Sequence, residues 1–413
     1  MGIYFGFLVS FCFLIFSVLR NIFIGYALIA CWVLFSLVSI KKGYTLKEIV
    51  KMSYNGGKQS FVVVRILILI GAVIGAWMAS GTIPAIVYYC LKYITPSTFI
   101  FFTFIICCAA SFLIGSSLGT VSTVGIPLMI MARSGNINLN MAAGAIIAGA
   151  YFGDRCSPMS SSAALVASLT KTNIFINIKN MVYSSIIPLL LSSVFYYTLS
   201  LTQPLKVINN NLSGELLGAF KIEFIILLPA IIILILSLCK VKIHISIFIS
   251  ILSAAVLAIL LQNCQLKEVI HSIVFGFQID GNSPLRNIIK GGGIVSMLKP
   301  ILVVFVSCSL AGIFEGIKVF DRFKNILTSK QLTRHKLFGI TSIVSILTAA
   351  FGCNQTISSV MTNEIMKDCY EDNDNYQFAL DIENSGILIS ALIPWNIAAL
   401  VPTTTMSVSA AGY

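Results

Sequence analysis

An acidic and a basic residue lie side by side in a part of the chain that is otherwise apolar. The stretch "GAYFGDRCSPMSSSA" (149–163) puts Asp154, Arg155, Pro158 and four serines between two apolar runs. A charged side chain at the centre of a lipid-facing helix costs about 2.5 to 3.5 kcal/mol, so we expect neither charge to face lipid. A carboxylate in a narrow aqueous cavity can hold a proton or a small cation, and competition between them gives exchange. We therefore predict that Asp154 is an exchange site.

The serines after Asp154 offer hydroxyl oxygens, and unwound carbonyls beside Pro158 would add more. Ser157, Ser160 and Ser161 could bind a hard monovalent cation, which prefers oxygen ligands, and we expect Na⁺ at Asp154 and Ser157. The alternatives are serines that bond only to their own helix backbone and an Asp154–Arg155 salt bridge. Arg155 could also be the counter-charge for an organic anion.

Two later stretches carry similar side chains. The candidates in "GCNQTISS" (352–359) and "ENSGILISALIPWN" (383–396) are Asn354, Gln355, Thr356, Glu383, Asn384, Ser385 and Asn396. The alternative for the amides and hydroxyls is interhelical hydrogen bonding, worth about 0.6 kcal/mol per contact in membranes. Glu383 could instead start a helix at the water interface.

These polar breaks recur in register. Gly115 and Gly352 are 237 residues apart, and Pro158 and Pro394 are 236 apart. Irregular backbone at membrane depth survives only when it is buried in protein or lines a watery cavity. A repeated pair of interrupted helices near the bilayer midplane is typical of secondary transporters.

The composition defines the elements that carry these residues. The chain has 413 residues, of which 57% are hydrophobic and 10% are charged, so we predict an all-α polytopic integral membrane protein. We expect ten or eleven transmembrane helices. The predicted spans lie near 3–19, 22–40, 61–79, 97–114, 140–153, 181–200, 223–239, 243–261, 300–318, 337–351 and 386–407.

The basic residues fall mostly in short connections, although the net charge is +12. This distribution indicates membrane topology rather than nucleic-acid binding. The densest basic connection, 41–58, is expected to be cytoplasmic. We divide the chain into N-terminal helices with this basic loop (1–59), a first transport repeat (60–200), linking helices with a polar connection (201–299) and a second transport repeat (300–413).

Several segments resemble the NhaC-type sodium/proton antiporter family. They are "GAVIGAWMASGTIPAIVYY" (71–89), "GSSLGTVSTVGIPLM" (115–129), "GAYFGDRCSPMSSSA" (149–163), "GCNQT" (352–356) and "LIPWN" (392–396). The resemblance implies two inverted repeats with broken or re-entrant helices around a central site. It also implies exchange of external protons for internal sodium, with some members swapping carboxylates such as malate and lactate.

On this resemblance, Asp154 and Ser157 match the family's Gly-Asp-x-x-Ser-Pro segment. Glu383 and Ser385 match its acidic segment. The chain departs from the family at Ser161 and at Asn384, where many members carry an aspartate. Family members also continue for another span or so beyond Tyr413, so we expect a shortened or divergent C-terminal region.

We predict a secondary active transporter of a prokaryotic cytoplasmic membrane that exchanges protons for Na⁺ or another monovalent cation by alternating access. The alternative is an antiporter or symporter of a small organic anion or amino acid. An intramembrane aspartyl protease needs two aspartates in adjacent spans, and no second apolar span carries one, so we expect no enzyme. The expected partners are the cation, the proton and the lipid bilayer, with a homodimer left open and no cofactor.

Overall fold

The computed structural model describes residues 2–20, 22–93, 96–204, 212–239, 241–279, 289–317, 333–370, 374–410 and 412–413. Within these ranges the elements are helices, apart from one short antiparallel pair of β1 (Phe277–Gln278) with β2 (Lys290–Gly291). Six of the described helices are long and apolar enough to cross a membrane, and four shorter apolar helices accompany them. The predicted all-α polytopic fold is confirmed.

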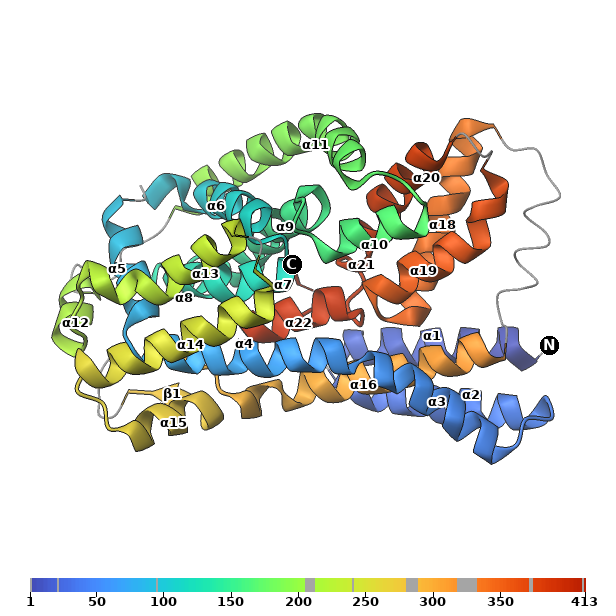
Figure 1. Ribbon diagram of the computed structural model, residues 1–413, viewed down its shortest axis with the longest axis horizontal. Coiled ribbons are helices and arrows are strands. Elements are labelled where there is room, and N and C mark those ends of the chain that lie inside the picture. Colours follow the sequence, from blue (N-terminus) through green and yellow to red (C-terminus); the bar gives the residue numbers. More distant parts are fainter. Residues whose placement is uncertain are drawn as a thin grey trace.

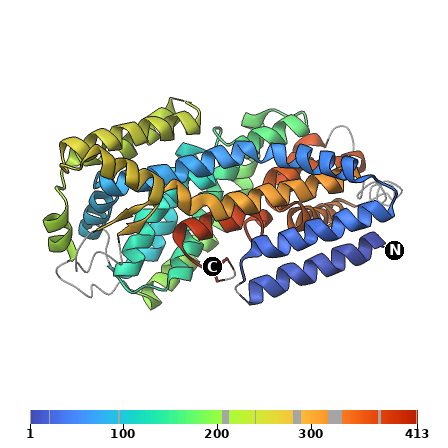
Figure 2. The same cartoon turned by 90° about the horizontal axis from the view of Figure 1, so that it is seen from below.

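The N-terminal helices pack against α16 (Leu298–Gly316), and Figure 2 shows α1 and α2 in dark blue at one edge of the molecule. Phe35 of α2 meets Phe314 of α16 edge to face, with ring centroids 4.6 Å apart. The helices of this region are α1 (Gly2–Leu19), α2 (Ile24–Lys41), α3 (Leu46–Gln59) and α4 (Phe61–Ala79).

The basic connection at 41–58 is not the loop that its charge indicated. Most of it forms α3, which begins with a capping box between Thr45 and Glu48. Gly56 lets α3 approach α16 closely, because a Cβ atom at Gly56 would lie 2.7 Å from the Cα atom of Gly312. The charged side chains of α3 therefore lie on a helix that is packed against α16.

The next elements along the chain belong to the first repeat and to the linking helices after it. Its elements are α5 (Thr82–Tyr93), η1 (Pro96–Thr98), α6 (Phe99–Ile114), α7 (Ser117–Thr120), the π-helix η2 (Val121–Gly125), α8 (Ile126–Ser134), α9 (Leu139–Cys156), α10 (Ser161–Leu169) and α11 (Ile174–Thr202). The linking elements are α12 (Leu212–Ala219), η3 (Phe224–Leu227), α13 (Leu228–Leu238), α14 (Ile243–Leu260), α15 (Leu266–Phe275) and η5 (Ile294–Met297). Residues 280–288 of the predicted polar connection lie outside the described residues.

The second repeat has two breaks like the first, but its π-helical turn lies before the second break instead of after the first. The elements of the second repeat are α18 (Arg334–Gly352), α19 (Gln355–Met366), η6 (Lys367–Cys369), α20 (Asn375–Ile382), the π-helix η7 (Glu383–Ile387), α21 (Leu388–Ser390) and α22 (Ile397–Met406). The span predicted at 386–407 is wrong as a single helix. Residues 391–396, which include Pro394, interrupt it, and Asn396 caps the new helix.

Each repeat contains two breaks at matching places. Gly115 ends α6 with φ of 69°, and Cys353 ends α18 with φ of 51°, so both helices stop at a left-handed residue. Residues 157–160 then separate α9 from α10, as residues 391–396 separate α21 from α22. The expectation of two polar breaks per half is confirmed.

The two repeats are inverted, and α11 shows this because its 29 residues extend for about 43 Å. The start of α6 lies at the end of α11, where the Ile100 amide donates to the Ser200 hydroxyl at 3.1 Å. The start of α18 lies near the beginning of α11, because Arg334 donates to Gln377 of α20 at 2.7 Å and the amide of Asn173, which caps α11, donates to the neighbouring Tyr376 hydroxyl at 3.4 Å. Both α6 and α18 then run inward from opposite ends of the molecule (Figure 1).

The short helices after the second breaks are exchanged between the repeats. α10 packs against α19 and α20, whereas α22 packs against α8, α9 and η2. Val166 of α10 shares an apolar cluster with Ile365 and Phe378, and the Tyr151 hydroxyl of α9 donates to the Ala398 carbonyl of α22 at 2.8 Å. Each repeat is therefore completed by a helix of the other.

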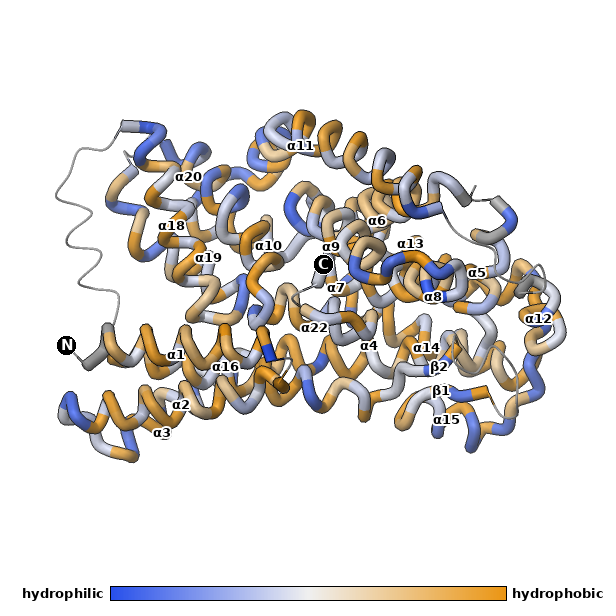
Figure 3. The backbone as a smooth tube through the Cα atoms, turned by 180° about the vertical axis from the view of Figure 1, so that it is seen from behind, coloured by the Kyte–Doolittle hydropathy of each residue, from blue (hydrophilic) through white to orange (hydrophobic). Residues whose placement is uncertain are grey.

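The outer helices present apolar side chains away from the core. Figure 3 shows apolar residues along α1, α2 and α11, and on α11 they include the exposed Ile187, Leu191 and Phe195. A surface of this kind fits contact with lipid hydrocarbon.

Candidate functional site

Asp154 lies where the two repeats meet. Its side chain, in the last turn of α9, is only 4% exposed. Oδ2 accepts a hydrogen bond from the Ser117 hydroxyl at 3.2 Å and another from the Gln355 amide at 3.3 Å. Ser117 begins α7 and Gln355 begins α19, so matching positions of the two repeats bind the same carboxylate.

The break after Asp154 is stabilised by the serines of the same stretch. The Ser157 hydroxyl accepts a hydrogen bond from the Met159 amide at 3.1 Å. Ser160 donates to the main-chain carbonyl of Asp154 and caps α10 by accepting from the Ala163 amide at 3.1 Å. Neither hydroxyl bonds to the Asp154 carboxylate, so both hold the backbone in the shape that ends α9.

Gln355 also joins Asp154 to the next half-helix. Its amide donates to the Ser162 hydroxyl at 3.3 Å, so one side chain of the second repeat contacts both α9 and α10. Asn354 caps α19 by accepting from the Thr356 amide at 2.8 Å. The Thr356 side chain itself is exposed. Of the three candidates in this stretch, only Gln355 reaches the carboxylate.

Arg155 points toward α11. Its terminal nitrogens donate to the Ser184 and Ser185 hydroxyls, each at 2.7 Å, and the guanidinium is 5% exposed. Two of its nitrogens are thus already bound within the protein. The alternative of an Asp154–Arg155 salt bridge does not fit this geometry.

Glu383 is a second buried carboxylate. It begins the π-helical turn η7 and is 1% exposed, which does not fit the alternative of a residue at the water interface. Within the described part of the chain, neither of its oxygens has a hydrogen-bond partner. It interacts electrostatically with Arg155 and with Asp154. A charged carboxylate without partners is costly in such a place, so this side chain is suited to taking up a proton or a cation.

The other candidates of the second repeat divide into two groups. Ser385 is buried beside Ser345, with 2.9 Å between the hydroxyl oxygens. Asn396 is also buried, but it caps α22 and donates to the Ala349 carbonyl at 2.8 Å. Asn384 is half-buried and Ser161 is exposed, so the structure does not bring these two to Asp154.

Sequence reasoning missed three serines that bind the charged groups. Ser117, Ser184 and Ser185 look like ordinary membrane-helix serines, and Ser184 and Ser185 lie on a distant helix. A signal for Ser117 did exist, because it follows the break at Gly115 as Gln355 follows the break at Cys353.

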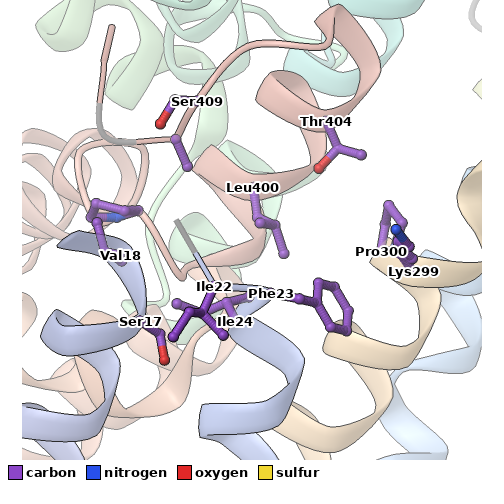
Figure 4. Close-up of a pocket in the computed structure, with 12 residues that line it drawn as sticks. Ser17, Val18, Ile22, Phe23, Ile24, Lys299, Pro300, Leu400, Thr404 and Ser409 are labelled. Carbon is purple, nitrogen blue, oxygen red and sulfur yellow. The ribbon is translucent and has the colours of Figure 1, made fainter. Parts of the chain in front are cut away.

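A cavity of about 230 Å³ lies beside the break at residues 391–396, where Pro394 lines it. It lies between the α1–α2 turn, the start of α16 and α22, and Figure 4 shows Leu400 and Thr404 of α22 across it from Phe23 and Ile24. Asp154 and Glu383 do not line it. The two carboxylates are therefore closed off from this cavity in the conformation described.

Inverted repeats of broken helices that meet around a buried carboxylate define a secondary transporter. The profile of the Na⁺/H⁺ antiporter family matches residues 149–412. The chain belongs to this family and is a secondary antiporter.

Curated relatives match most of the chain. A malate-2H⁺/Na⁺-lactate antiporter of Bacillus subtilis (strain 168) is 30% identical over 96% of this chain and 86% of its own length. The Na⁺/H⁺ antiporter NhaC of the same organism is 29% identical over 92% of this chain and 86% of its own. An arginine/ornithine antiporter, ArcD, of Halobacterium salinarum is 25% identical over 90% and 78%, respectively. The resemblance to NhaC-type antiporters is confirmed.

Proposed function

We propose that this protein exchanges protons for Na⁺ across a bacterial cytoplasmic membrane by alternating access, with Asp154 as the carboxylate that holds either ion. One observation carries the proposal: Asp154 is buried at a helix break and is hydrogen-bonded by both repeats. Movement of one repeat against the other would change these hydrogen bonds. The strength with which Asp154 holds a cation would then differ between the two orientations of the site.

Glu383 would act with Asp154. It is buried, lacks hydrogen-bond partners among the described residues and interacts electrostatically with Asp154. Two nearby carboxylates repel each other when both are charged, which favours uptake of a proton or a cation by at least one of them. We expect the transported ions to suffice, without a cofactor.

Arg155 points toward α11 and not toward Asp154, which fits a cation as the ion held by Asp154. Ser184 and Ser185 take one N–H donor from each terminal nitrogen, and Nε has no hydrogen-bond partner among the described residues. The relatives include exchangers of malate, lactate, arginine and ornithine, so organic substrates are the alternative to be tested.

The test uses everted membrane vesicles that contain a pH-sensitive dye. We expect added Na⁺ to release protons from wild-type vesicles, and Asp154→Asn to abolish the response. Asp374→Asn, which neutralises an exposed carboxylate, should behave as wild type. Unchanged exchange in Asp154→Asn would contradict the proposed site.

The substrate class is tested in the same vesicles. We expect Na⁺ to release protons from the vesicles even when the medium contains no malate, lactate or amino acids. A response that appears only when one of these is added would instead favour the organic-substrate alternative. A homodimer is still a prediction. Light scattering of the detergent-solubilised protein would test it by measuring the molecular mass of the particle.

A further inference from the structure

Five buried hydroxyl groups gather in the second repeat, away from the hydrogen bonds that hold Asp154. Each of these side chains is at most 1% exposed, and together we name them the hydroxyl cluster: Ser345, Thr348, Ser358, Thr362 and Ser385. Ser345 and Ser385 are 2.9 Å apart at their oxygens, and Thr348 lies 3.0 Å from Thr362 and 3.1 Å from Ser358. Three separate segments, α18, α19 and η7, contribute them.

The hydrogen bonds of the cluster leave an excess of acceptor oxygens. A hydroxyl has one donor and two lone pairs. Ser385 donates to the Asp381 carbonyl at 2.6 Å, and both Ser358 and Thr348 have the Ser345 carbonyl in reach, at 3.2 and 3.1 Å. The hydroxyls also bond to one another, but each has two lone pairs for one proton, so acceptor oxygens stay in excess of donors. An interior lined by lone pairs attracts a cation.

Gly386 leaves space beside these oxygens. A Cβ atom built there would lie 3.6 Å from the Ser345 oxygen, 3.7 Å from that of Ser358 and 3.8 Å from that of Ser359. A methyl group would therefore fit without a clash, in a place faced by three hydroxyls. Gly386 belongs to the π-helical turn η7, and such turns occur frequently at functional sites.

The first repeat shows that this packing of helices does not require the hydroxyls. When the repeats are matched at their breaks, the five positions are occupied by Cys107, Ala110, Thr120, Val124 and Gly149. Gly386 is matched there by Ala150, whose own Cβ atom occupies the corresponding place. The same arrangement of helices is thus built with a single hydroxyl.

Glu383 supplies a negative charge on the same turn. It lies three residues before Gly386, is 1% exposed and has no hydrogen-bond partner among the described residues. Arg155 interacts with Glu383 electrostatically without a hydrogen bond to it, and a buried carboxylate is stabilised further by a cation bound nearby. This independent observation also points to a ligand of positive charge.

We propose that the hydroxyl cluster and Gly386 form a binding site for a dehydrated Na⁺ ion, separate from Asp154. Neutral oxygen ligands on the same turn as the Glu383 carboxylate suit a hard monovalent cation. The inference rests on the proposed function, which makes Na⁺ the transported ion. The second repeat would then bind a sodium ion in addition to the proton or Na⁺ that Asp154 holds.

Transport kinetics give the first test, with Ser345→Ala and Gly386→Ala in everted vesicles. The first variant removes a ligand, and the second fills the space with a methyl group that meets its neighbours at ordinary contact distances. We expect the Na⁺ concentration for half-maximal exchange to rise at least tenfold in each, with the rate at saturating Na⁺ retained. Ser342→Ala is the control, because Ser342 is half-buried on the same helix, lies outside the hydroxyl cluster and donates to the Phe338 carbonyl.

Thermal unfolding in detergent gives a second test that does not depend on transport. We expect NaCl, compared with choline chloride, to raise the Tm of wild type, Ser342→Ala and Asp154→Asn. The rise should be lost in Ser345→Ala and in Gly386→Ala. Because Gly386→Ala introduces no clash, it tests the site even if Ser345→Ala folds poorly.

The two proposals fail in different ways. Wild-type vesicles that release no protons on addition of Na⁺ would overturn the proposed function. If wild type responds and Asp154→Asn does not, but Gly386→Ala keeps both its Na⁺ dependence and its Na⁺-induced Tm rise, only the hydroxyl-cluster site is overturned.

Discussion

Asp154 is bound by residues that begin equivalent helices. Ser117 and Gln355 each follow a left-handed residue that ends the preceding helix, and each donates to Oδ2. Hydrogen bonds to charged groups are worth about 1.5 to 3 kcal/mol, more than those between neutral groups. The carboxylate is therefore sensitive to the position of both repeats at once.

We predict that Gln355→Ala lowers the exchange rate at a fixed Na⁺ concentration about tenfold. The Asp154 carboxylate loses one of its two hydrogen-bond donors in this variant. A loss of about 1.4 kcal/mol, at the lower end for a hydrogen bond to a charged group, corresponds to a factor of about ten. The rate is measured by dye response in everted vesicles. Glu364→Ala, at an exposed position of the same helix, should be unaffected. Equal rates in Gln355→Ala and wild type would show that the inter-repeat hydrogen bond does not contribute.

The sequence predicts helices and their breaks better than it predicts their partners. Pro158, Pro394 and the glycines mark where the chain must stop being helical, because these effects are local. The bonds from Arg155 to Ser184 could not be predicted, since they join helices that only the tertiary fold brings together. The π-helical turn at Glu383 also has no distinct local pattern.

The basic segment at 41–58 shows a different limit of prediction from sequence. Its charge density indicated a loop, yet Thr45 and Glu48 have the spacing of a capping box, and Gly56 permits close approach to another helix. Charge alone does not decide between a loop and a helix when one face of the helix can be buried.

Close packing of α6 on α9 positions Asp154, and glycine permits it. A Cβ atom at Gly149 would lie 2.6 Å from Cys107 Cβ and 2.7 Å from the Phe104 carbonyl oxygen. We predict that Gly149→Ala destabilises the protein by about 1 to 3 kcal/mol, as overpacking does. The measurement is thermal unfolding in detergent.

Gly144 provides the matched control on the same helix. A Cβ atom there would meet nothing closer than 4.0 Å, so Gly144→Ala should be neutral or slightly stabilising. If both variants have the same Tm, close approach of α6 and α9 is not what requires glycine.

At the scale of the whole molecule, the exchanged half-helices join the repeats. The Arg133 guanidinium at the end of α8 donates to the Met406 carbonyl at the end of α22, at 2.6 Å. Tyr151 donates to the Ala398 carbonyl near the start of the same helix. Helix α22 is thus held to the first repeat at both of its ends.

We predict that Arg133→Gln loosens α22. A charged hydrogen bond is lost, so amide hydrogen exchange of residues 397–406 should become about tenfold faster, while α14 is unchanged. Arg65→Gln, at an exposed position of α4, is the control. Equal protection of residues 397–406 in Arg133→Gln and wild type would contradict this attachment.

The exchange of α10 and α22 also sets an order of assembly during synthesis. The ribosome makes α10 well before α18, α19 and α20, against which it packs. α10 can pack at once against α9 and α11, but its contacts with the second repeat must wait until more than 160 further residues have been translated. Helix α22 is made after the whole first repeat and then docks against α8 and α9, so completion of the earlier half depends on the later one.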